Sequence, residues 1–280
     1  MPTRIIKKTE LIPGRTTLMV LDAPQIATTA KPGNFVMLRV HEKGERFPLT
    51  IADIDRKDGS ISIVFLVMGK STDMLNKLEA GDCIADLCGP LGKPTKIERC
   101  GTVLCVGGGT GIAAMHHIAK GHHQAGNHVV AVMGARSRDL LLFYSELKSF
   151  CPEVLVSTDD GSMGHKGLVT ELLAQRLGCD KSVQEVVAVG PVPMMSAVVQ
   201  TVKPFGVHTT VSLNSMMVDG MGMCGACRVT IGGEVKFTCV DGPEFAGDLV
   251  DFGELQQRLA SLKDREKEAH EHYRRCGCHE

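Results

Sequence analysis

The stretch Thr102-Val-Leu-Cys-Val-Gly-Gly-Gly-Thr-Gly111 combines a buried-type strand with a glycine turn, and Ile112-Ala-Ala-Met-His-His begins a helix directly after it. Such a turn exposes backbone amides, which together with the helix N-terminus can bind a phosphate group. Gly107, Gly108, Gly109, Thr110 and Gly111 are therefore candidate residues for binding a dinucleotide. The turn departs from the strict GxGxxG fingerprint because Ile112 occupies its sixth position. The hypothesis of dinucleotide binding therefore also depends on the secondary structure predicted around the turn.

The region around this stretch, residues 99–205, alternates strands with helices. Strands are predicted at Thr102–Val106, Val129–Gly134, Val154–Thr158 and Val186–Val189, with helices over about 112–124, 139–149, 166–177 and 192–203. This βαβ pattern predicts a parallel sheet and an α/β dinucleotide domain. The last strand leads into Gly190-Pro191, a second candidate loop, because such sheets bind ligands at the carboxyl ends of their strands.

The regions before and after it differ in composition and in the predicted pattern of secondary structure. In residues 1–98 the β-prone runs Thr16–Leu21, Asn34–Val40 and Ser60–Val67 are separated by turn residues, which predicts an antiparallel β-barrel. Residues 206–250 are rich in Gly, Met and Cys. Residues 251–280 are predicted to form a helical tail with an apolar stripe at its start and a charged continuation that commonly packs on something else. The fold class predicted is α+β multidomain, with a barrel, a parallel-sheet domain and a small cysteine-bearing subdomain.

The composition and charge of the chain indicate which kinds of molecule it is expected to bind. The chain has 280 residues, 43% of them apolar and 22% charged, with a formal net charge of −1. These values are typical of a globular protein and give no general attraction to nucleic acid. No run approaches the ~20 apolar residues that cross a bilayer, and Met1–Lys8 is not the apolar start of a signal peptide. We therefore expect a cytoplasmic protein that binds neither nucleic acid nor membrane.

The strongest local signal is Asp219-Gly-Met-Gly-Met-Cys224-Gly-Ala-Cys227, followed by Cys239. Its spacing is that of the plant-type [2Fe-2S] ferredoxins, with Asp219 in the place of the first thiolate. Glycines allow the loop to wrap around an inorganic core, and a carboxylate is a suitable hard ligand for ferric iron. Asp219, Cys224, Cys227 and Cys239 are therefore predicted to hold a [2Fe-2S] cluster.

Other uses of these residues remain open. A Cys-x2-Cys pair also binds zinc, although zinc needs further ligands and only Cys239 follows before the C-terminus. Asp219 is also an ordinary turn residue before glycine. Six further cysteines are read as small buried hydrophobic residues, namely Cys83, Cys88, Cys100, Cys105, Cys151 and Cys179. Cys276-Gly-Cys278, beside His279, is either a redox pair or without function.

The order of barrel, glycine-rich dinucleotide domain and cysteine cluster resembles the ferredoxin-reductase-like flavoproteins over about residues 1–250. Within that family the runs Val218–Val229 and Phe237–Phe245 are most similar to the small subunits of NADH-dependent ferredoxin:NADP oxidoreductases. The electron-transfer subunits of dihydroorotate dehydrogenase have a similar layout but usually carry four cysteines at the cluster, so Asp219 favours the first group.

The resemblance implies a flavin site. Arg46-Phe-Pro-Leu-Thr-Ile51 looks like the family's flavin motif, in which Arg46 would meet the FAD diphosphate and Thr50 would approach flavin N5. Pro48 lies within this motif, and Leu49 stands where many relatives have an aromatic ring. Arg46 also lies one residue further from Thr50 than is usual, and the alternative is a surface salt bridge. Gly69, Lys70, Ser71 and Thr72 match the family's second diphosphate loop, and Gly190-Pro191 matches the loop below the nicotinamide.

The same resemblance implies FAD, NAD(H) and a [2Fe-2S] cluster as cofactors. Hydride would pass from NADH to FAD and single electrons from FAD to the cluster, so no protein acid or base is expected. NADH is expected rather than NADPH, although Arg136 and Arg138 are suited to a 2′-phosphate. A larger flavin and iron–sulfur subunit is expected as partner in a heterodimer. The alternatives are the dihydroorotate dehydrogenase electron-transfer subunit and a non-catalytic iron–sulfur carrier or sensor.

Overall fold

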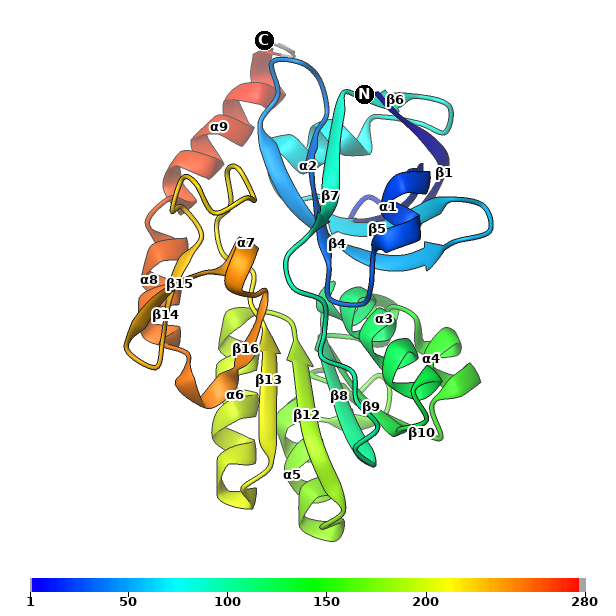
Figure 1. Ribbon diagram of the computed structural model, residues 1–280, viewed down its shortest axis with the longest axis vertical. Helices are drawn as coiled ribbons and strands as arrows, with labels where there is room; N and C mark the ends of the chain where they lie inside the picture. Colours follow the sequence, from blue (N-terminus) through cyan, green and yellow to red (C-terminus); the bar gives the residue numbers. More distant parts are fainter. Residues whose placement is uncertain (1, 277–280) are drawn as a thin grey trace.

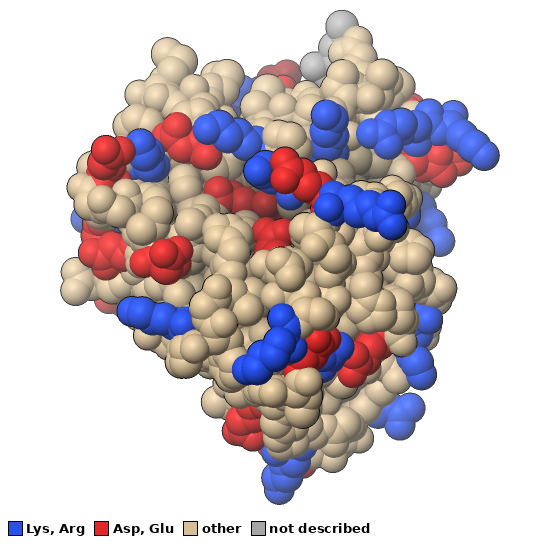
Figure 2. Space-filling view, turned by 60° about the horizontal axis from the view of Figure 1, so that its bottom comes forward, with Lys and Arg blue, Asp and Glu red and all other residues tan. Residues whose placement is uncertain are grey.

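The computed structural model describes residues 2–276 and contains two seven-stranded sheets and a two-stranded sheet. Figure 1 shows the sheet of the N-terminal region above that of the central region, with the C-terminal segments along one side of both. Within the described residues, no helix is long and apolar enough to cross a membrane. On the face shown in Figure 2, basic and acidic side chains are interspersed, in keeping with the net charge of −1.

The N-terminal sheet is antiparallel and has the strand order β6-β1-β2-β5-β4-β3-β7. Its strands are β1 (Thr3–Ile12), β2 (Thr16–Asp22), β3 (Phe35–Arg39), β4 (Arg46–Asp55), β5 (Ser60–Leu66), β6 (Cys83–Ile84) and β7 (Asp86–Leu91). Alternate side chains of β2 and β5 are buried in one core, as expected for a sheet that curls around its own interior. The predicted barrel-like antiparallel domain is confirmed. Two short helices, α1 (Pro24–Thr29) and α2 (Lys70–Asn76), pack on it.

The central sheet has the order β11-β10-β9-β8-β12-β13-β16, and all its pairs are parallel except that of β16. Its strands are β8 (Thr102–Gly108), β9 (His128–Ala135), β10 (Glu153–Thr158), β11 (His165–Lys166), β12 (Val183–Val189), β13 (His208–Ser212) and β16 (Glu244–Ala246). Helices α3 (Gly111–Gln124) and α4 (Tyr144–Phe150) cover one face, and α5 (Val169–Cys179) and α6 (Val192–Val202) cover the other. The predicted parallel-sheet domain is confirmed.

Two of the predicted helices begin later than expected. The 139–149 segment starts as the 3-10 turn η1 (Arg138–Leu140), and α4 begins only after Phe143, whose φ of 56° is left-handed. The 166–177 segment opens with β11, and Gly167, at a φ of +146°, separates this strand from α5. Propensity alone does not show these breaks, because the first occurs at the left-handed residue Phe143 and the second depends on the pairing of β11 with β10.

After η2 (Lys203–Phe205) the chain still contributes to the central sheet, because β13 and β16 both hydrogen-bond into it. Between these two strands lies a small unit made of the cysteine-bearing loop, the hairpin β14 (Arg228–Ile231) and β15 (Glu234–Phe237), and α7 (Thr238–Asp241). The predicted boundary at residue 205 therefore marks a change in composition, whereas the central sheet continues beyond it into β13 and β16.

The tail forms the 3-10 turn η3 (Gly247–Leu249) and the helices α8 (Phe252–Ala260) and α9 (Lys263–Cys276). The predicted apolar stripe consists of Phe252, Leu255, Leu259 and Leu262; Phe252 and Leu255 are buried, Leu262 is half-buried and Leu259 is exposed. The charged helix α9 packs on α2 of the N-terminal region of the same chain. Cys278 and His279 lie outside the described residues, as does the side chain of Cys276, so the proposed redox pair stays a prediction.

Candidate functional site

The glycine turn after β8 and the loop after β12 pack directly against each other. A Cβ atom at Gly111 would lie 2.6 Å from the carbonyl oxygen of Val189 and 2.8 Å from Cα of Gly190. A Cβ at Gly190 would lie 3.3 Å from the backbone nitrogen of Gly108. The structure therefore brings the two predicted nucleotide loops together, and glycine is required there because the two backbones approach more closely than a side chain allows.

The position of these loops in the sheet is that of a ligand site. From β8 the chain passes to β9 and β10 on one side, and then crosses to β12 on the other side of β8. In open α/β sheets ligands bind outside the carboxyl ends of the strands at such a reversal of strand order. Gly107–Gly111 includes the last two residues of β8 and the turn after it, Gly190-Pro191 directly follows β12, and α3 begins at Gly111.

Arg136 and Arg138 lie in the loop after β9 and are both exposed. This loop is tied to the loop after β10, because the backbone amide of Arg138 donates to Oγ of Ser162 at 2.8 Å and the amide of Asp160 donates to the carbonyl of Arg136 at 3.2 Å. Hydrogen bonds from Ser162 lower the pKa of Asp160. A carboxylate thus accompanies the two arginines at this edge of the sheet.

The predicted flavin motif forms the first half of β4. Arg46 is exposed and its Nη2 lies 2.7 Å from Oδ2 of Asp86 on β7, an ion pair whose hydrogen bond lowers the pKa of Asp86. Pro48, Leu49 and Thr50 are half-buried, and β4 pairs Thr50 with Phe35 of β3. Arg46 thus carries the surface salt bridge that was the alternative reading, and its role toward FAD stays a prediction.

The second predicted flavin segment, Gly69–Thr72, meets the first through Glu45. Oγ of Ser71 donates to Glu45 at 2.8 Å, and Nζ of Lys70 lies 3.8 Å from the same carboxylate. The hydroxyl of Thr72 accepts hydrogen bonds from the amides of Met68 and Gly69, each at 3.1 Å. Sequence reasoning missed Glu45, whose one signal is that it directly precedes Arg46.

Helix α3 connects the glycine turn to β4, the strand with the predicted flavin motif, and this contact was not predicted from the sequence. Nδ1 of His117 lies 2.9 Å from the carbonyl oxygen of Ile51, the residue after Thr50. Nζ of Lys120 lies 2.8 Å from Oδ1 of Asp53, two residues further along β4. Burial lowers the pKa of His117, so the ring is neutral and donates from Nδ1 to the carbonyl. The spacing of residues along the chain does not predict these contacts, because α3 and β4 are far apart in the sequence.

The cysteine-bearing loop is organised by Asp219. Its two carboxylate oxygens accept hydrogen bonds from the backbone amides of Met221 at 3.0 Å, Met223 at 3.0 Å and Cys224 at 2.8 Å. These bonds, led by that from Met221, lower the pKa of Asp219 and keep it ionised. Gly220 and Gly222 have φ values of +74° and +81°, which a side chain would disfavour.

Two of the four predicted ligands meet. Sγ of Cys227 lies 3.2 Å from Sγ of Cys239, and both side chains are buried, whereas Cys224 is exposed. Within residues 2–276, no three His, Cys, Asp or Glu side chains converge on one point, so the full ligand set stays a prediction. Of the six other cysteines only Cys105 and Cys151 are buried. The buried reading is therefore wrong for the exposed Cys83, Cys88, Cys100 and Cys179. Cys83 begins β6, Cys88 lies within β7, Cys100 precedes β8 and Cys179 ends α5.

The paired thiols of Cys227 and Cys239 are suitable ligands for a metal cation. Burial, followed by the hydrogen bond and charge of Cys227, raises the pKa of Cys239 to about 12. Two thiolates this close would repel each other in an apolar surrounding unless a metal supplied positive charge. Asp219 adds an ionised carboxylate within the same loop. The donor types present, thiols and an ionised carboxylate, therefore fit an iron–sulfur cluster, and Asp219, Cys224, Cys227 and Cys239 stay its predicted ligands.

The paired cysteines also lie at the interface with the N-terminal barrel-like domain. Cys227, Cys239 and Met217 form one buried cluster with Phe35 and Met37 of β3. The partners of Phe35 and Met37 in the ladder between β3 and β4 are Thr50 and Pro48 of the predicted flavin motif. One strand therefore separates the cysteine pair from the flavin motif.

Comparison with known proteins agrees with this arrangement. Residues 105–200 match the family model of the oxidoreductase NAD-binding domain, and residues 214–251 match that of the iron–sulfur cluster binding domain of dihydroorotate dehydrogenase B. The chain is 47% identical over 253 residues to a homolog of the dihydroorotate dehydrogenase B (NAD(+)) electron transfer subunit from Thermotoga maritima, covering 90% of this chain and 89% of that protein.

Solved structures give the same picture. A chain from the structure of an NADH-dependent reduced ferredoxin-NADP oxidoreductase is 44% identical and superimposes with a TM-score of 0.91, covering 98% of each chain. The ferredoxin reductase in carbazole 1,9a-dioxygenase, at 19% identity and a TM-score of 0.61, covers 74% of this chain and 66% of its own, and shares the fold alone. The chain therefore belongs to the ferredoxin-reductase-like family of electron-transfer subunits, in which an oxidoreductase NAD-binding domain is joined to an iron–sulfur cluster binding domain of the dihydroorotate dehydrogenase B type.

Proposed function

We propose that this chain is the NADH-oxidising electron-transfer subunit of a larger flavin and iron–sulfur oxidoreductase. FAD would accept hydride from NADH, and a [2Fe-2S] cluster would carry the electrons onward one at a time. In this proposal residues 1–98 bind FAD, residues 99–205 bind the dinucleotide and residues 206–250 bind the cluster, with 251–280 as a helical tail.

The observation that carries the proposal is the shared apolar cluster between the cysteine pair and β3. Phe35 and Met37 pack in one cluster with the buried Cys227 and Cys239, and their partners on the neighbouring strand β4 are Thr50 and Pro48. A flavin lying on β4 would thus be one strand away from the cluster. This closeness favours direct electron transfer between them over two independent cofactor sites.

The position of the predicted dinucleotide site supports the same sequence of electron transfer, from NADH to FAD and then to the cluster. The α3 helix, which begins at the glycine turn, is hydrogen-bonded through His117 to the carbonyl of Ile51, next to Thr50. A dinucleotide held by Gly107–Gly111 would therefore be fixed relative to β4. The protein groups act by position: Thr50 would approach flavin N5, and the amides of the glycine turn would bind the pyrophosphate.

The partner is inferred from the relatives. The relative from Thermotoga maritima is named a homolog of an electron transfer subunit, and the solved chain at 44% identity comes from an NADH-dependent reduced ferredoxin-NADP oxidoreductase. We propose a heterodimer with a larger flavin and iron–sulfur subunit of that type. The second candidate, favoured by the 47% identity to the Thermotoga maritima homolog, is the electron-transfer partner of a dihydroorotate dehydrogenase.

The test is anaerobic purification from the native host, with identification of the co-purifying subunit and assay of flavin, iron and NADH oxidation. We expect FAD, iron and sulfide in the purified complex, and bleaching of the flavin by NADH. A partner that oxidises dihydroorotate would select the second candidate. A protein that lacks flavin, or that contains zinc in place of iron, would contradict the proposal.

A further inference from the structure

The two C-terminal helices form a continuous strap, residues 252–276, that runs from the cysteine-bearing loop to the flavin domain. Figure 1 shows α8 beside the hairpin of β14 and β15, and α9 continuing from it toward α2. The contacts agree, since α8 packs on α6 and β14 and α9 packs on α2. The strap therefore touches two regions assigned above to different cofactors.

At its first end the strap holds the cysteine loop. Phe252 and Leu255 are buried in the core shared with the central sheet, which fixes α8. From this helix Nη2 of Arg258 donates a hydrogen bond of 3.1 Å to the carbonyl oxygen of Ala226. Ala226 lies between Cys224 and Cys227, so the strap holds the backbone of the Cys-x2-Cys segment itself.

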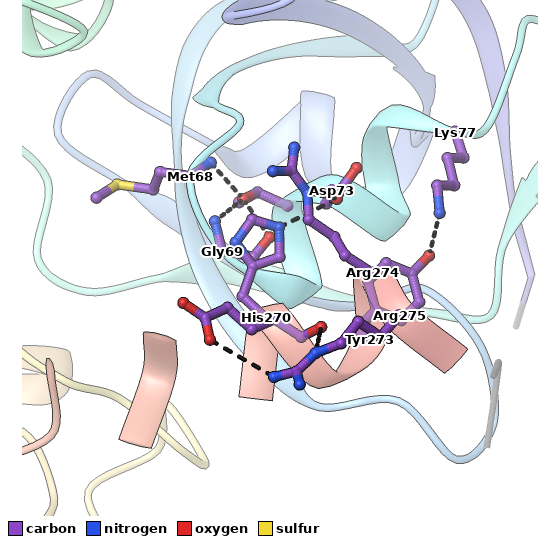
Figure 3. A network of polar contacts seen from close by, with 10 residues as sticks. Met68, Gly69, Asp73, Lys77, His270, Tyr273, Arg274 and Arg275 are labelled. Atoms are coloured by element: carbon purple, nitrogen blue, oxygen red, sulfur yellow. Dashed lines mark hydrogen bonds and ion pairs between the residues drawn. The ribbon is translucent and has the colours of Figure 1, made fainter. Parts of the chain in front are cut away.

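At its other end the strap holds α2. Figure 3 shows His270 and Tyr273 of α9 directed toward this helix, where Nε2 of His270 lies 3.1 Å from Oδ2 of Asp73. Nζ of Lys77 donates to the hydroxyl of Tyr273 at 2.7 Å and lies 4.3 Å from the centre of its ring. Tyr273 is only 3% exposed although α9 is otherwise strongly polar, so it is the apolar anchor of the contact.

Helix α2 depends on these contacts because it is short. Its seven residues are too few for a helix that is stable without tertiary packing. Leu75 packs in the core of the barrel, Met74 is also buried, and α9 packs against the same helix. The helix follows directly from Gly69, and the hydroxyl of Thr72 binds the amides of Met68 and Gly69. A shift of α2 would therefore move the Gly69–Thr72 loop.

We propose that the strap is a positioning element that holds the cysteine loop and the Gly69–Thr72 loop at a fixed separation. Arg258 is the positioning residue at the cluster end, and Asp73, His270 and Tyr273 are those at the flavin end. This inference rests on the proposed function, since it concerns how flavin and cluster are held for electron transfer. It gives the charged tail an internal role, in place of a docking surface for another protein.

The experiment compares Tyr273→Ala and Arg258→Ala with Lys267→Ala, a control on the strap whose side chain is 77% exposed. Amide hydrogen exchange is first measured at residues 70–76 and 224–227 in the protein as purified. We expect faster exchange at 70–76 in Tyr273→Ala, faster exchange at 224–227 in Arg258→Ala, and wild-type exchange in Lys267→Ala.

The functional readout separates the two electron steps. In anaerobic stopped-flow mixing with NADH, flavin bleaching should keep its wild-type rate within about twofold, while cluster reduction slows by about tenfold or more in both strap variants, because a small displacement of reacting groups is costly. The FAD Kd of Tyr273→Ala should rise about tenfold, which corresponds to about 1.4 kcal/mol.

Wild-type exchange and wild-type cluster reduction in both strap variants would overturn the inference. If Tyr273→Ala does not fold, Tyr273→Phe with His270→Leu removes the hydrogen bonds to Lys77 and Asp73 and keeps the aromatic ring, and the same comparison applies. A wild-type protein without flavin would end the proposed function, whereas the exchange measurements would still decide whether the strap holds both loops.

Discussion

Nδ1 of His117 lies 2.9 Å from the carbonyl oxygen of Ile51 and joins α3, the helix after the glycine turn, to β4, the strand that carries the predicted flavin motif. The carbonyl can only accept, so Nδ1 carries the proton. Nearby on α3, His116 and His122 are also buried, and Nε2 of His122 and Nδ1 of His116 have no hydrogen-bond partner within the described structure. Charging any of these rings would therefore disturb the interface or the core beside it.

Because these three histidines are buried, we expect the free energy of unfolding to decrease in acid. Burial lowers the pKa of His116, His117 and His122 below the ordinary value of 6.5. The unfolded chain therefore binds more protons than the folded one below about pH 6.5, and the free energy of unfolding falls as the pH falls from there. Above that pH their contribution is complete. Each histidine adds a slope of at most about 1.4 kcal/mol per pH unit.

Thermal unfolding at pH values between about 5.5 and 7.5 measures this slope. His117→Asn keeps a donor near the position of Nδ1 and cannot be protonated, so its unfolding should depend less on pH than that of the wild type. The exposed His128→Asn is the control and should keep the full dependence. An identical slope in wild type and His117→Asn would rule out His117 as a contributor.

Gly111→Ala should disrupt the nucleotide site. The new methyl group would lie 2.6 Å from the carbonyl oxygen of Val189, a backbone atom that cannot turn away. We expect a loss of about 1–3 kcal/mol of stability and weaker NADH binding. Gly178→Ala is the control, because the added Cβ meets no atom within 4 Å on α5 and should stabilise that helix slightly. Calorimetry and NADH titration measure both; equal behaviour of the two variants would contradict the close approach.

Cys227→Ala should abolish the cluster, because the pair with Cys239 at 3.2 Å is lost. Asp219→Cys should retain a cluster with an altered reduction potential, since a thiolate replaces an oxygen ligand. Iron and sulfide analysis with visible and electron paramagnetic resonance spectra measures both, and Met223→Ser, a change at an 83% exposed side chain in the same loop, is the control. Full iron content in Cys227→Ala would remove this residue from the ligand set.

Arg46→Ala should weaken FAD retention, because it removes a charge-assisted hydrogen bond to the diphosphate. The expected rise in the FAD Kd is about tenfold, corresponding to about 1.4 kcal/mol. Asp86→Asn tests the alternative reading, since Oδ2 of Asp86 is the present partner of Arg46 at 2.7 Å. A diphosphate-binding Arg46 predicts that Asp86→Asn retains FAD. If instead both variants lose stability and FAD equally, Arg46 serves only as a salt bridge.

The chain should prefer NADH to NADPH, with the ratio of kcat/KM values as the measurement. Arg136 and Arg138 are exposed in the loop after β9, and Asp160 on the adjoining loop would repel a 2′-phosphate. Arg138→Ala should therefore leave kcat/KM for NADH within about twofold. A strong preference for NADPH that Arg138→Ala removes would refute the assignment and identify the arginine as the phosphate ligand.

The sequence by itself determined the elements whose signals are local. The glycine turn at 107–111, the spacing of Asp219, Cys224 and Cys227, and the change from alternating to continuous apolar runs each depend on residues near one another in the chain. Backbone conformation and side-chain periodicity act over a few residues, so they can be read from a few residues. The barrel-like sheet and the parallel sheet followed from these patterns, and the structure confirms both.

Tertiary structure alone decided how the sites meet. The crossing of the chain from β10 to the far side of β8 juxtaposes the two nucleotide loops, and His117 finds Ile51 across 66 residues. Lys77 and Tyr273, which seat the C-terminal strap on α2, are separated by 196 residues. Such contacts are selected by packing and burial over the whole chain, where many alternative partners have the same local chemistry. The sequence therefore named the candidate cofactor residues, and the fold determined which of them lie together.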